Sequence, residues 1–242
     1  MTQKPDYVIE RRDIGLVPEI LDFFKKNPAN GLREMDEKEL AELVKKGLFF
    51  VARKGEGGPI VGTVYFSEQV KSGARREYEM GGGLVARKER QKGLIECLGV
   101  CAISAFRLES RRSAADASSP VAIVGRVEAS NKTRIREVLT GLGFESAGTG
   151  LIDPGDKPGL TLMPKNKDGL VNVDEFIFDE AKLKDRVREA IKYRDTCALN
   201  DEGATVHVAV GSLNADDDGD PLREFLAELD SSHVPPASPD GR

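Results

Sequence analysis

An apolar strand pattern in this chain passes through a short basic loop directly into an amphipathic helix pattern. The apolar run ends at Leu84-Val85, the loop carries Arg90 and Lys92, and the helical pattern begins at Leu94. The first amide groups of a helix have no partner inside the helix, and the helix dipole favours negative charge at that end. The sequence therefore predicts a site for a phosphorylated ligand around residues 90–95.

Gly93 is the residue of this loop at which a ligand can come closest to the main chain, because glycine has no Cβ. The sequence contains neither the Walker pattern nor the dinucleotide-binding glycine pattern, so the predicted site is of neither kind. A second group of glycines, Gly81-Gly82-Gly83, lies inside the predicted strand. Glycines inside a strand mark either a bulge or the close approach of a ligand, and both interpretations stay open.

A second segment repeats the order of strand, polar turn and helix. Residues 121–127 are apolar almost throughout, as expected for an interior strand covered on both faces. Ser130-Asn131 forms the polar turn, and a helical pattern extends from Asn131 to Leu142-Gly143-Phe144.

Together the two segments resemble the GNAT superfamily of acetyl-CoA-dependent N-acetyltransferases, over roughly residues 5–150. In that family a pattern like V-x-P-x-x-R-x-x-G-x-G/A holds the pyrophosphate of coenzyme A, and a second segment reads N-x-x-S/A…L-G-F. The positions that match the first pattern are Val85, Arg90, Gly93 and Leu94. Those that match the second are Asn131 and Leu142-Gly143-Phe144.

The chain departs from the family pattern at several positions. Ile95 stands where the pattern has Gly or Ala, and its branched side chain crowds the space of the pyrophosphate. Arg87 stands where the pattern has Pro, and the helix from Asn131 to Phe144 is one residue longer than the common form. Many members carry a Tyr about seven residues after the Asn as the acid that protonates the thiolate, whereas this chain has Val138 and Leu139 there.

The resemblance implies acetyl-CoA as cosubstrate, with no metal. The amides of residues 84–86 would hold the pantetheine, those of residues 91–95 the pyrophosphate, and Asn131 would shape the far side of the site. The residues assigned to acetyl-CoA in this way are Leu84, Val85, Ala86, Arg90, Gln91, Lys92, Gly93, Leu94, Ile95 and Asn131.

Glu79 is the candidate general base, because transfer to an amine requires a group that takes its proton. It precedes Arg90 by eleven residues, an offset at which some histone-type members of the family place their base. Glu77 lies on the same face of the strand and competes for the role, whereas Tyr78 faces the other way. A glutamate that simply faces solvent remains the alternative interpretation.

These features predict an N-acetyltransferase that moves an acetyl group to a primary amine by direct attack in a ternary complex. The acceptor, a small-molecule or protein amine, would enter over the first two helices, where Phe23, Phe24 and Glu34 are the expected contacts. Ile95 and the missing Tyr also fit a second hypothesis, a catalytically degenerate module that binds acyl-CoA or a protein partner without turnover.

Composition excludes several other classes of function. The formal net charge of −5 argues against nonspecific nucleic-acid binding, which needs a basic surface. No apolar run reaches the length of a membrane span, and the N-terminus has no signal-peptide pattern. The odd number of cysteines, 3, lacks framework spacing, which favours the reducing cytoplasm.

The order of the patterns predicts an α/β chain with a mixed, mostly antiparallel sheet flanked by helices. Residues 1–150 are expected to form the acetyltransferase core. Residues 151–212 are expected to form an extension, with strands that close the sheet and a helix at 179–193, that serves as a partner surface or the arm of a homodimer. Residues 213–242 are expected to hold an acidic linker, a short helix and a disordered tail.

Overall fold

The structure is a computed structural model that describes residues 5–11, 13–29, 35–69, 76–113, 121–154, 164–192, 196–199, 205–210 and 221–231. Within these residues one sheet has the strand order β6-β7-β5-β4-β3-β2-β1-β9-β8. The strands are β1 (Tyr7–Arg11), β2 (Phe49–Lys54), β3 (Ile60–Gln69), β4 (Arg76–Val85), β5 (Val121–Glu128), β6 (Phe144–Ile152), β7 (Val171–Phe178), β8 (Thr196–Leu199) and β9 (Thr205–Val210).

Neighbouring strands of this sheet are antiparallel except for two pairs, β4 with β5 and β1 with β9, which are parallel. The predicted mixed, mostly antiparallel sheet is therefore confirmed.

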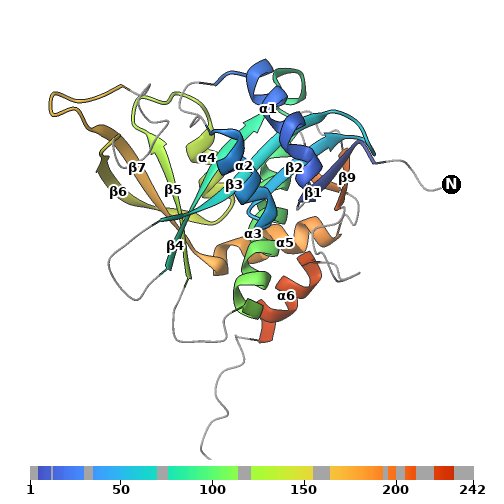
Figure 1. Ribbon diagram of the computed structural model, residues 1–242. Coiled ribbons are helices and arrows are strands. Elements are labelled where there is room, and N and C mark those ends of the chain that lie inside the picture. The colour runs from blue at the N-terminus through green and yellow to red at the C-terminus, as the bar shows by residue number, and fades with distance from the viewer. Residues whose placement is uncertain are drawn as a thin grey trace, which may run out of the picture.

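Helices pack on both faces of the sheet (Figure 1). The α-helices are α1 (Val17–Lys26), α2 (Glu37–Lys45), α3 (Leu94–Ser113), α4 (Ile135–Gly141), α5 (Glu180–Lys192) and α6 (Pro221–Ser231), and the 3-10 turns are η1 (Ile14–Leu16) and η2 (Arg87–Glu89). One core cluster joins α1 and α2 to the sheet, and a second cluster joins α3 to its other face. We call these the α1–α2 face and the α3 face.

Local sequence accounts for how several helices begin and end. The Asp36 side chain accepts a hydrogen bond of 2.7 Å from the Glu39 amide and so caps α2, and Gly47 follows the helix with a φ of 68°. Asp13 caps the η1 turn, where its side chain accepts a hydrogen bond from the Gly15 amide at 2.8 Å, and α1 begins after that turn.

The helix predicted from Asn131 to Phe144 is much shorter in the structure. The Asn131 side chain accepts hydrogen bonds from the amide and the hydroxyl of Thr133, which holds this stretch as a turn, and α4 begins only at Ile135. Phe144 then opens β6, a strand that the sequence did not predict because most of its side chains are exposed and polar or small. Within the extension expected at residues 151–212, residues 155–163 lie outside the described residues.

A glycine bulge interrupts β4. Tyr65 of β3 is opposite Gly81 and Thr63 is opposite Leu84, so Gly82 and Gly83 together face a single residue of β3. Gly82 has a φ of 63°, and a Cβ built on it would lie 2.2 Å from the Tyr65 ring. Only glycine fits this position, because any side chain meets both strained backbone and an aromatic ring.

We predict that Gly82→Ala lowers the free energy of unfolding more than Gly57→Ala does. Gly57 has a φ of 65° and nothing within 4 Å of its built Cβ, so both changes cost backbone strain and only the first adds overlap with Tyr65. The difference should be about 2 kcal/mol in urea unfolding, the usual scale of an overpacked site. In a Tyr65→Ala background the difference should shrink. If the difference between the Gly82→Ala and Gly57→Ala losses were the same in the wild-type and the Tyr65→Ala backgrounds, this account of the bulge would be contradicted.

Candidate active site

β4 and β5 pair at one end and separate at the other. Their parallel register runs from Arg76 opposite Val121 to Met80 opposite Gly125, and beyond these residues the two ribbons diverge (Figure 1). β4 remains paired with β3, and β5 remains paired with β7. We call the diverging segments, residues 81–85 of β4 and 126–128 of β5, the fork. Each strand of the fork therefore has an edge that is not paired with the other strand, and an edge of this kind can pair with an extended ligand.

Hydrogen bonds show which β4 groups point into the fork. The Ala86 amide donates to the Val61 carbonyl of β3 at 2.8 Å, so this amide is engaged in the sheet. The Val85 carbonyl accepts from the side chain of Arg90 at 2.9 Å, on the side away from β3. Since successive residues of a strand alternate in direction, the Val85 amide faces the fork and the Leu84 amide faces β3. Of the three amides at residues 84–86, only the one at Val85 therefore faces the fork.

The amides of residues 91–95 form the second part of the site. Among the described residues, no main-chain oxygen accepts from them, and the first bond of α3 runs from the Cys97 amide to the Gly93 carbonyl at 3.0 Å. Gly93 has a φ of 70°, and Gln91, with a φ of 63°, is strained for a residue with a side chain. These amides before and at the start of α3 have the chemistry to bind an anion.

Two basic side chains of this loop, those of Arg90 and Lys92, are engaged with the protein itself. Arg90 binds the Val85 carbonyl, as described above. Lys92 donates to Glu89 at 2.8 Å, and Lys54 and the Tyr7 hydroxyl reach the same carboxylate oxygen at 3.2 and 2.5 Å. We call Tyr7, Lys54, Glu89 and Lys92 the Glu89 cluster. It ties the loop to β1 and β2, and sequence reasoning missed it because Tyr7 and Glu89 are distant in the chain.

The Glu89 cluster shifts the pKa values of its members. Burial alone would raise the pKa of Glu89, but the hydrogen bonds from Lys92, Tyr7 and Lys54 lower it to about 2. Burial, followed by the hydrogen bond to Glu89, raises the pKa of Tyr7 to about 12. Glu89 is therefore ionised and Tyr7 protonated at neutral pH.

We predict that Glu89→Gln lowers the free energy of unfolding by roughly 3 kcal/mol at pH 7, the value of a pKa lowered from 4.5 to about 2. A lowered carboxyl pKa stabilises the fold above the unfolded value and ceases to do so as pH falls through the folded value. The difference from wild type should therefore shrink between pH 4.5 and 2 in urea unfolding.

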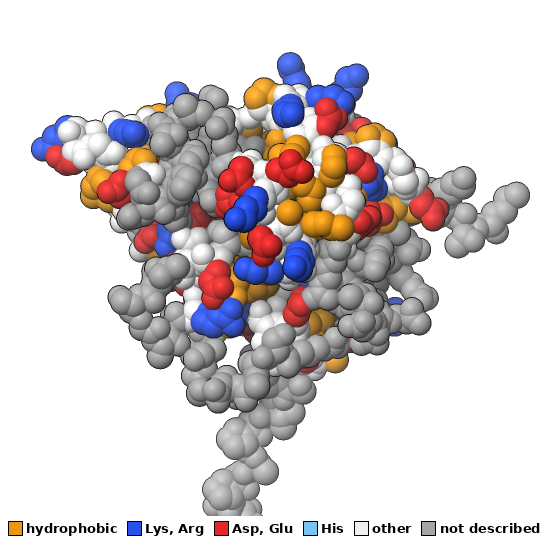
Figure 2. Space-filling model, viewed as in Figure 1, with side chains coloured by type: hydrophobic (Ala, Val, Ile, Leu, Met, Phe, Trp, Pro, Cys, Tyr) orange, Lys and Arg blue, Asp and Glu red, His pale blue; other side chains and the backbone are white. Residues whose placement is uncertain are grey.

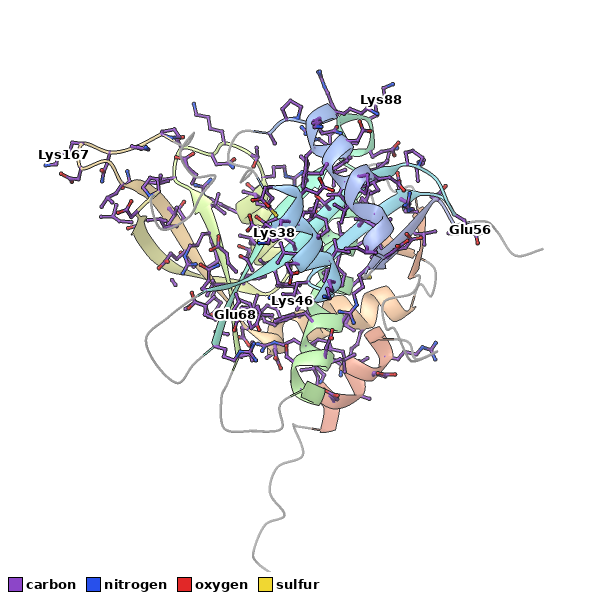
Figure 3. All side chains as sticks on the ribbon, in the orientation of Figure 1. Lys38, Lys46, Glu56, Glu68, Lys88 and Lys167 are labelled. Carbon is purple, nitrogen blue, oxygen red and sulfur yellow. The ribbon has the colours of Figure 1, made fainter. Side chains whose placement is uncertain are left out.

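The matched control for this prediction is Glu56→Gln, in the exposed turn between β2 and β3 (Figure 3). It should leave the free energy of unfolding within about 0.5 kcal/mol of wild type at every pH. A loss for Glu89→Gln that stays constant with pH would show that the charge of Glu89 is not its cause.

Ile95 lies at the fork, beside Gly83. A Cβ built on the exposed Gly83 would lie 3.5 Å from Ile95 Cδ1 and 3.7 Å from Ile135 Cδ1. Ile95 and Ile135 are half-buried and pack against the core of the α3 face. These two side chains therefore give the fork an apolar wall beside the Gly83 backbone.

Glu79 lies on the α1–α2 face of β4, just before the strands separate. Arg126 of β5 donates to Glu79 at 2.9 Å, to Glu77 at 2.9 Å and to Glu175 of β7 at 2.9 Å. Tyr78 faces away from Glu79, as predicted, and its ring centroid lies 4.8 Å from that of Phe106 on the α3 face. The sequence did not indicate Arg126.

Burial lowers the pKa of Arg126, but the hydrogen bond to Glu175 and the charge of Glu79, followed by Glu77, outweigh burial and raise it. Arg126 therefore stays charged at every pH at which the fold is stable. We call Arg126, Glu77, Glu79 and Glu175 the Arg126 cluster.

The residues expected on the far side of the site are held by local bonds. Arg136 donates to the main-chain oxygen of Asn131 and to Asp174 of β7, the latter at 2.7 Å, and so fixes the turn after β5. On α4, Val138 is half-buried and Leu139 packs against Gly125, and neither hydrocarbon side chain has a proton to donate. A different tyrosine, Tyr65 of β3, lies beside Gly81, two residues after Glu79: its hydroxyl would be 3.2 Å from a Cβ built on Gly81.

The three residues expected to contact the acceptor have different positions. Phe23 is 4% exposed and belongs to the core under α1, so it presents almost no surface to a ligand. Phe24 is half-buried and packs edge-on against Phe49, with the two ring centroids 6.2 Å apart. Glu34 lies outside the described residues. The side drawn in Figure 2 carries acidic and basic side chains interspersed around apolar ones.

The described part of the chain holds neither a cluster of metal-ligating side chains nor a membrane-spanning helix. In these ranges no three His, Cys, Asp or Glu side chains come together as a metal site would require. None of the helices seen in the described residues combines the length and apolar character needed to cross a membrane.

Comparison with known proteins gives structural matches alone. No model of a known protein family matches the chain, and no curated protein sequence matches it. A chain of the NatC complex bound to Gag peptide and CoA is 15% identical with a TM-score of 0.51, over 72% of this chain and 98% of that one.

Two more solved structures are similar to a lesser degree. The acetyltransferase of GNAT family from Streptococcus pneumoniae is 11% identical with a TM-score of 0.45, over 70% of this chain and 97% of that one. The putative acetyltransferase yncA from Salmonella typhimurium, solved with acetyl-CoA, is 16% identical with a TM-score of 0.47, over 72% of this chain and 94% of that one.

Proposed function

We propose, on the premise that the chain has the GNAT fold, that it is an N-acetyltransferase that uses acetyl-CoA and a primary amine. The observation that carries the proposal is the set of amides at residues 91–95, which has no main-chain acceptor among the described residues and lies at the start of α3. The fold would bring such a loop to the open end of the fork, so one ligand can occupy both. A diphosphate joined to an extended arm has this shape and chemistry.

The residues present fit acetyl-CoA in chemistry. The amides of residues 91–95 would hold the diphosphate, and the Val85 amide would pair with the extended arm along β4. Gly83 and Gly93 have no Cβ, so the ligand can lie against the backbone at both points. Acetyl-CoA would supply the activated acyl group.

Glu79 is the proposed base, because it is the carboxylate nearest the end of the β4–β5 pairing on the α1–α2 face. It would take the proton from the attacking amine, directly or through a water molecule. Cys97 and Cys101 are fully buried thiols on α3, so neither is placed to form a covalent acyl-enzyme. Direct attack in a ternary complex is therefore the proposed course.

A second candidate function follows from Ile95. Its side chain fills space beside Gly83 that the family pattern leaves to Gly or Ala. Together with the absence of a tyrosine from α4, this favours a module of the same fold that binds acyl-CoA or a protein partner without turnover.

We predict that coenzyme A stabilises the protein by roughly 2.7 kcal/mol when present at 100 times its dissociation constant. Gly93→Ala should remove most of this effect, because a Cβ at a φ of 70° strains the loop and crowds the ligand. Gly169→Ala is the control, since Gly169 has a φ of 81° with nothing within 4 Å of its built Cβ. Thermal unfolding with and without ligand measures both. No stabilisation by coenzyme A or acetyl-CoA would instead support the partner-binding module.

We predict that Glu79→Gln lowers kcat about 100-fold, the scale of general-base catalysis, and leaves coenzyme A binding unchanged. Thiol release from acetyl-CoA is followed across peptide N-termini, lysine, polyamines and aminoglycosides. Glu77→Gln tests the competing carboxylate, and Glu68→Gln is a control on the neighbouring strand β3 (Figure 3). Unchanged turnover in Glu79→Gln would remove it as the base, and binding without thiol release from any acceptor would favour a sensor.

A further inference from the structure

Arg126 makes the densest set of ion pairs at the fork. Its Nε, Nη1 and Nη2 atoms each contact a different carboxylate at 2.9 Å, and its side chain is 10% exposed. Two of the carboxylates, Glu77 and Glu79, are on β4, and the third, Glu175, is on β7. The guanidinium is a rigid planar fork of donors, so partners on both sides fix its orientation completely.

The position of Arg126 relative to the strand pairing is unusual. It follows Gly125, the last β5 residue paired with β4, and therefore reaches back across the base of the fork to Glu79. The strands themselves are already joined there, because β5 pairs with β4 up to this point and with β7 beyond it. A buried ion pair adds little net stability, since desolvation offsets most of its attraction. Cohesion of the sheet is thus a weak reason for the cluster.

We propose that Arg126 is a positioning residue, which holds the Glu79 carboxylate in the direction needed to receive the proton of the acceptor amine. The inference rests on the proposed function, in which Glu79 is the base. A glutamate on a strand has several side-chain rotamers, and one strong bond to Oε2 selects among them. Glu175 of β7 completes the arrangement, because it accepts a hydrogen bond from Nε of Arg126 on the side of β5 away from β4.

The expected kinetic effect of the proposal is confined to kcat. Arg126→Ala should lower kcat roughly 30-fold, since small errors in the placement of a reacting group cost up to about 100-fold. The KM for acetyl-CoA should stay within about 2-fold, because Arg126 is not among the groups that would hold it. Arg76→Ala is the matched control. Arg76 is also an arginine, and it lies on β4, but its side chain pairs with Glu68. Its removal should leave kcat and the KM for acetyl-CoA unchanged.

A double-mutant cycle separates positioning from a structural role. In a Glu79→Gln background, Arg126→Ala should lower the residual kcat by less than about 2-fold, because the group that it positions is already gone. A structural role predicts the same 30-fold loss in both backgrounds and would overturn the proposal. Added methylguanidinium should restore part of the kcat of Arg126→Ala and none of that of Glu79→Gln.

Glu175→Gln tests the proposal if Arg126→Ala does not fold. This carboxylate is 38% exposed and lies on β7, so its change leaves Glu79 and β4 intact. We expect a loss of about 5-fold in kcat at unchanged KM for acetyl-CoA, and an unchanged kcat would overturn the proposal. If the wild-type protein binds coenzyme A but acetylates no acceptor, the proposed function fails and the inference falls with it. If the wild type is active and the kcat values of Arg126→Ala and Glu175→Gln equal that of the wild type, only the inference fails.

Discussion

The separation of β4 from β5 is the constraint on which the rest of the site depends. Two parallel strands pair as far as Met80 and Gly125 and then part, while each keeps its other neighbour. The bulge at Gly82 and Gly83 lies just beyond the last pair, and a bulge bends its strand and increases the local twist. The resulting strand edge carries polar backbone groups that an extended ligand can satisfy. Without this divergence, the amides before α3 would adjoin a closed sheet.

Two charge clusters hold the groups on either side of the fork. The Glu89 cluster surrounds one carboxylate with two ammonium groups and a phenol, and it anchors the loop that carries residues 91–95 to β1 and β2. The Arg126 cluster surrounds one guanidinium with three carboxylates at the base of the fork. In both, a partly buried charge has several partners of opposite sign, which offsets its desolvation. The loop and the proposed base are thus held by tertiary contacts.

The buried face of a helix and the start of a helix depend on neighbouring residues in the sequence, and these features were predictable. Leu40, Leu43 and Val44 recur at helical spacing in the sequence, and all three are buried on α2. α3 begins at Leu94, where the basic loop gives way to helical spacing, and the amides before it have no main-chain acceptor among the described residues. The helix that was expected from Asn131 was wrong in length, because an apolar spacing does not reveal that Asn131 binds Thr133 and delays the helix. β6 was missed because an exposed edge strand has no apolar alternation to detect.

By itself the sequence determined the strand, basic loop and helix that present open amides, since hydrophobic period and helix-end chemistry are local properties. It also placed Glu79 on the strand before that loop and on the face opposite Tyr78. Only the tertiary structure decided that Arg126 meets Glu79 and that Tyr7 meets Glu89. Those partners lie 47 and 82 residues apart, so their meeting depends on strand order and register, which no local pattern contains.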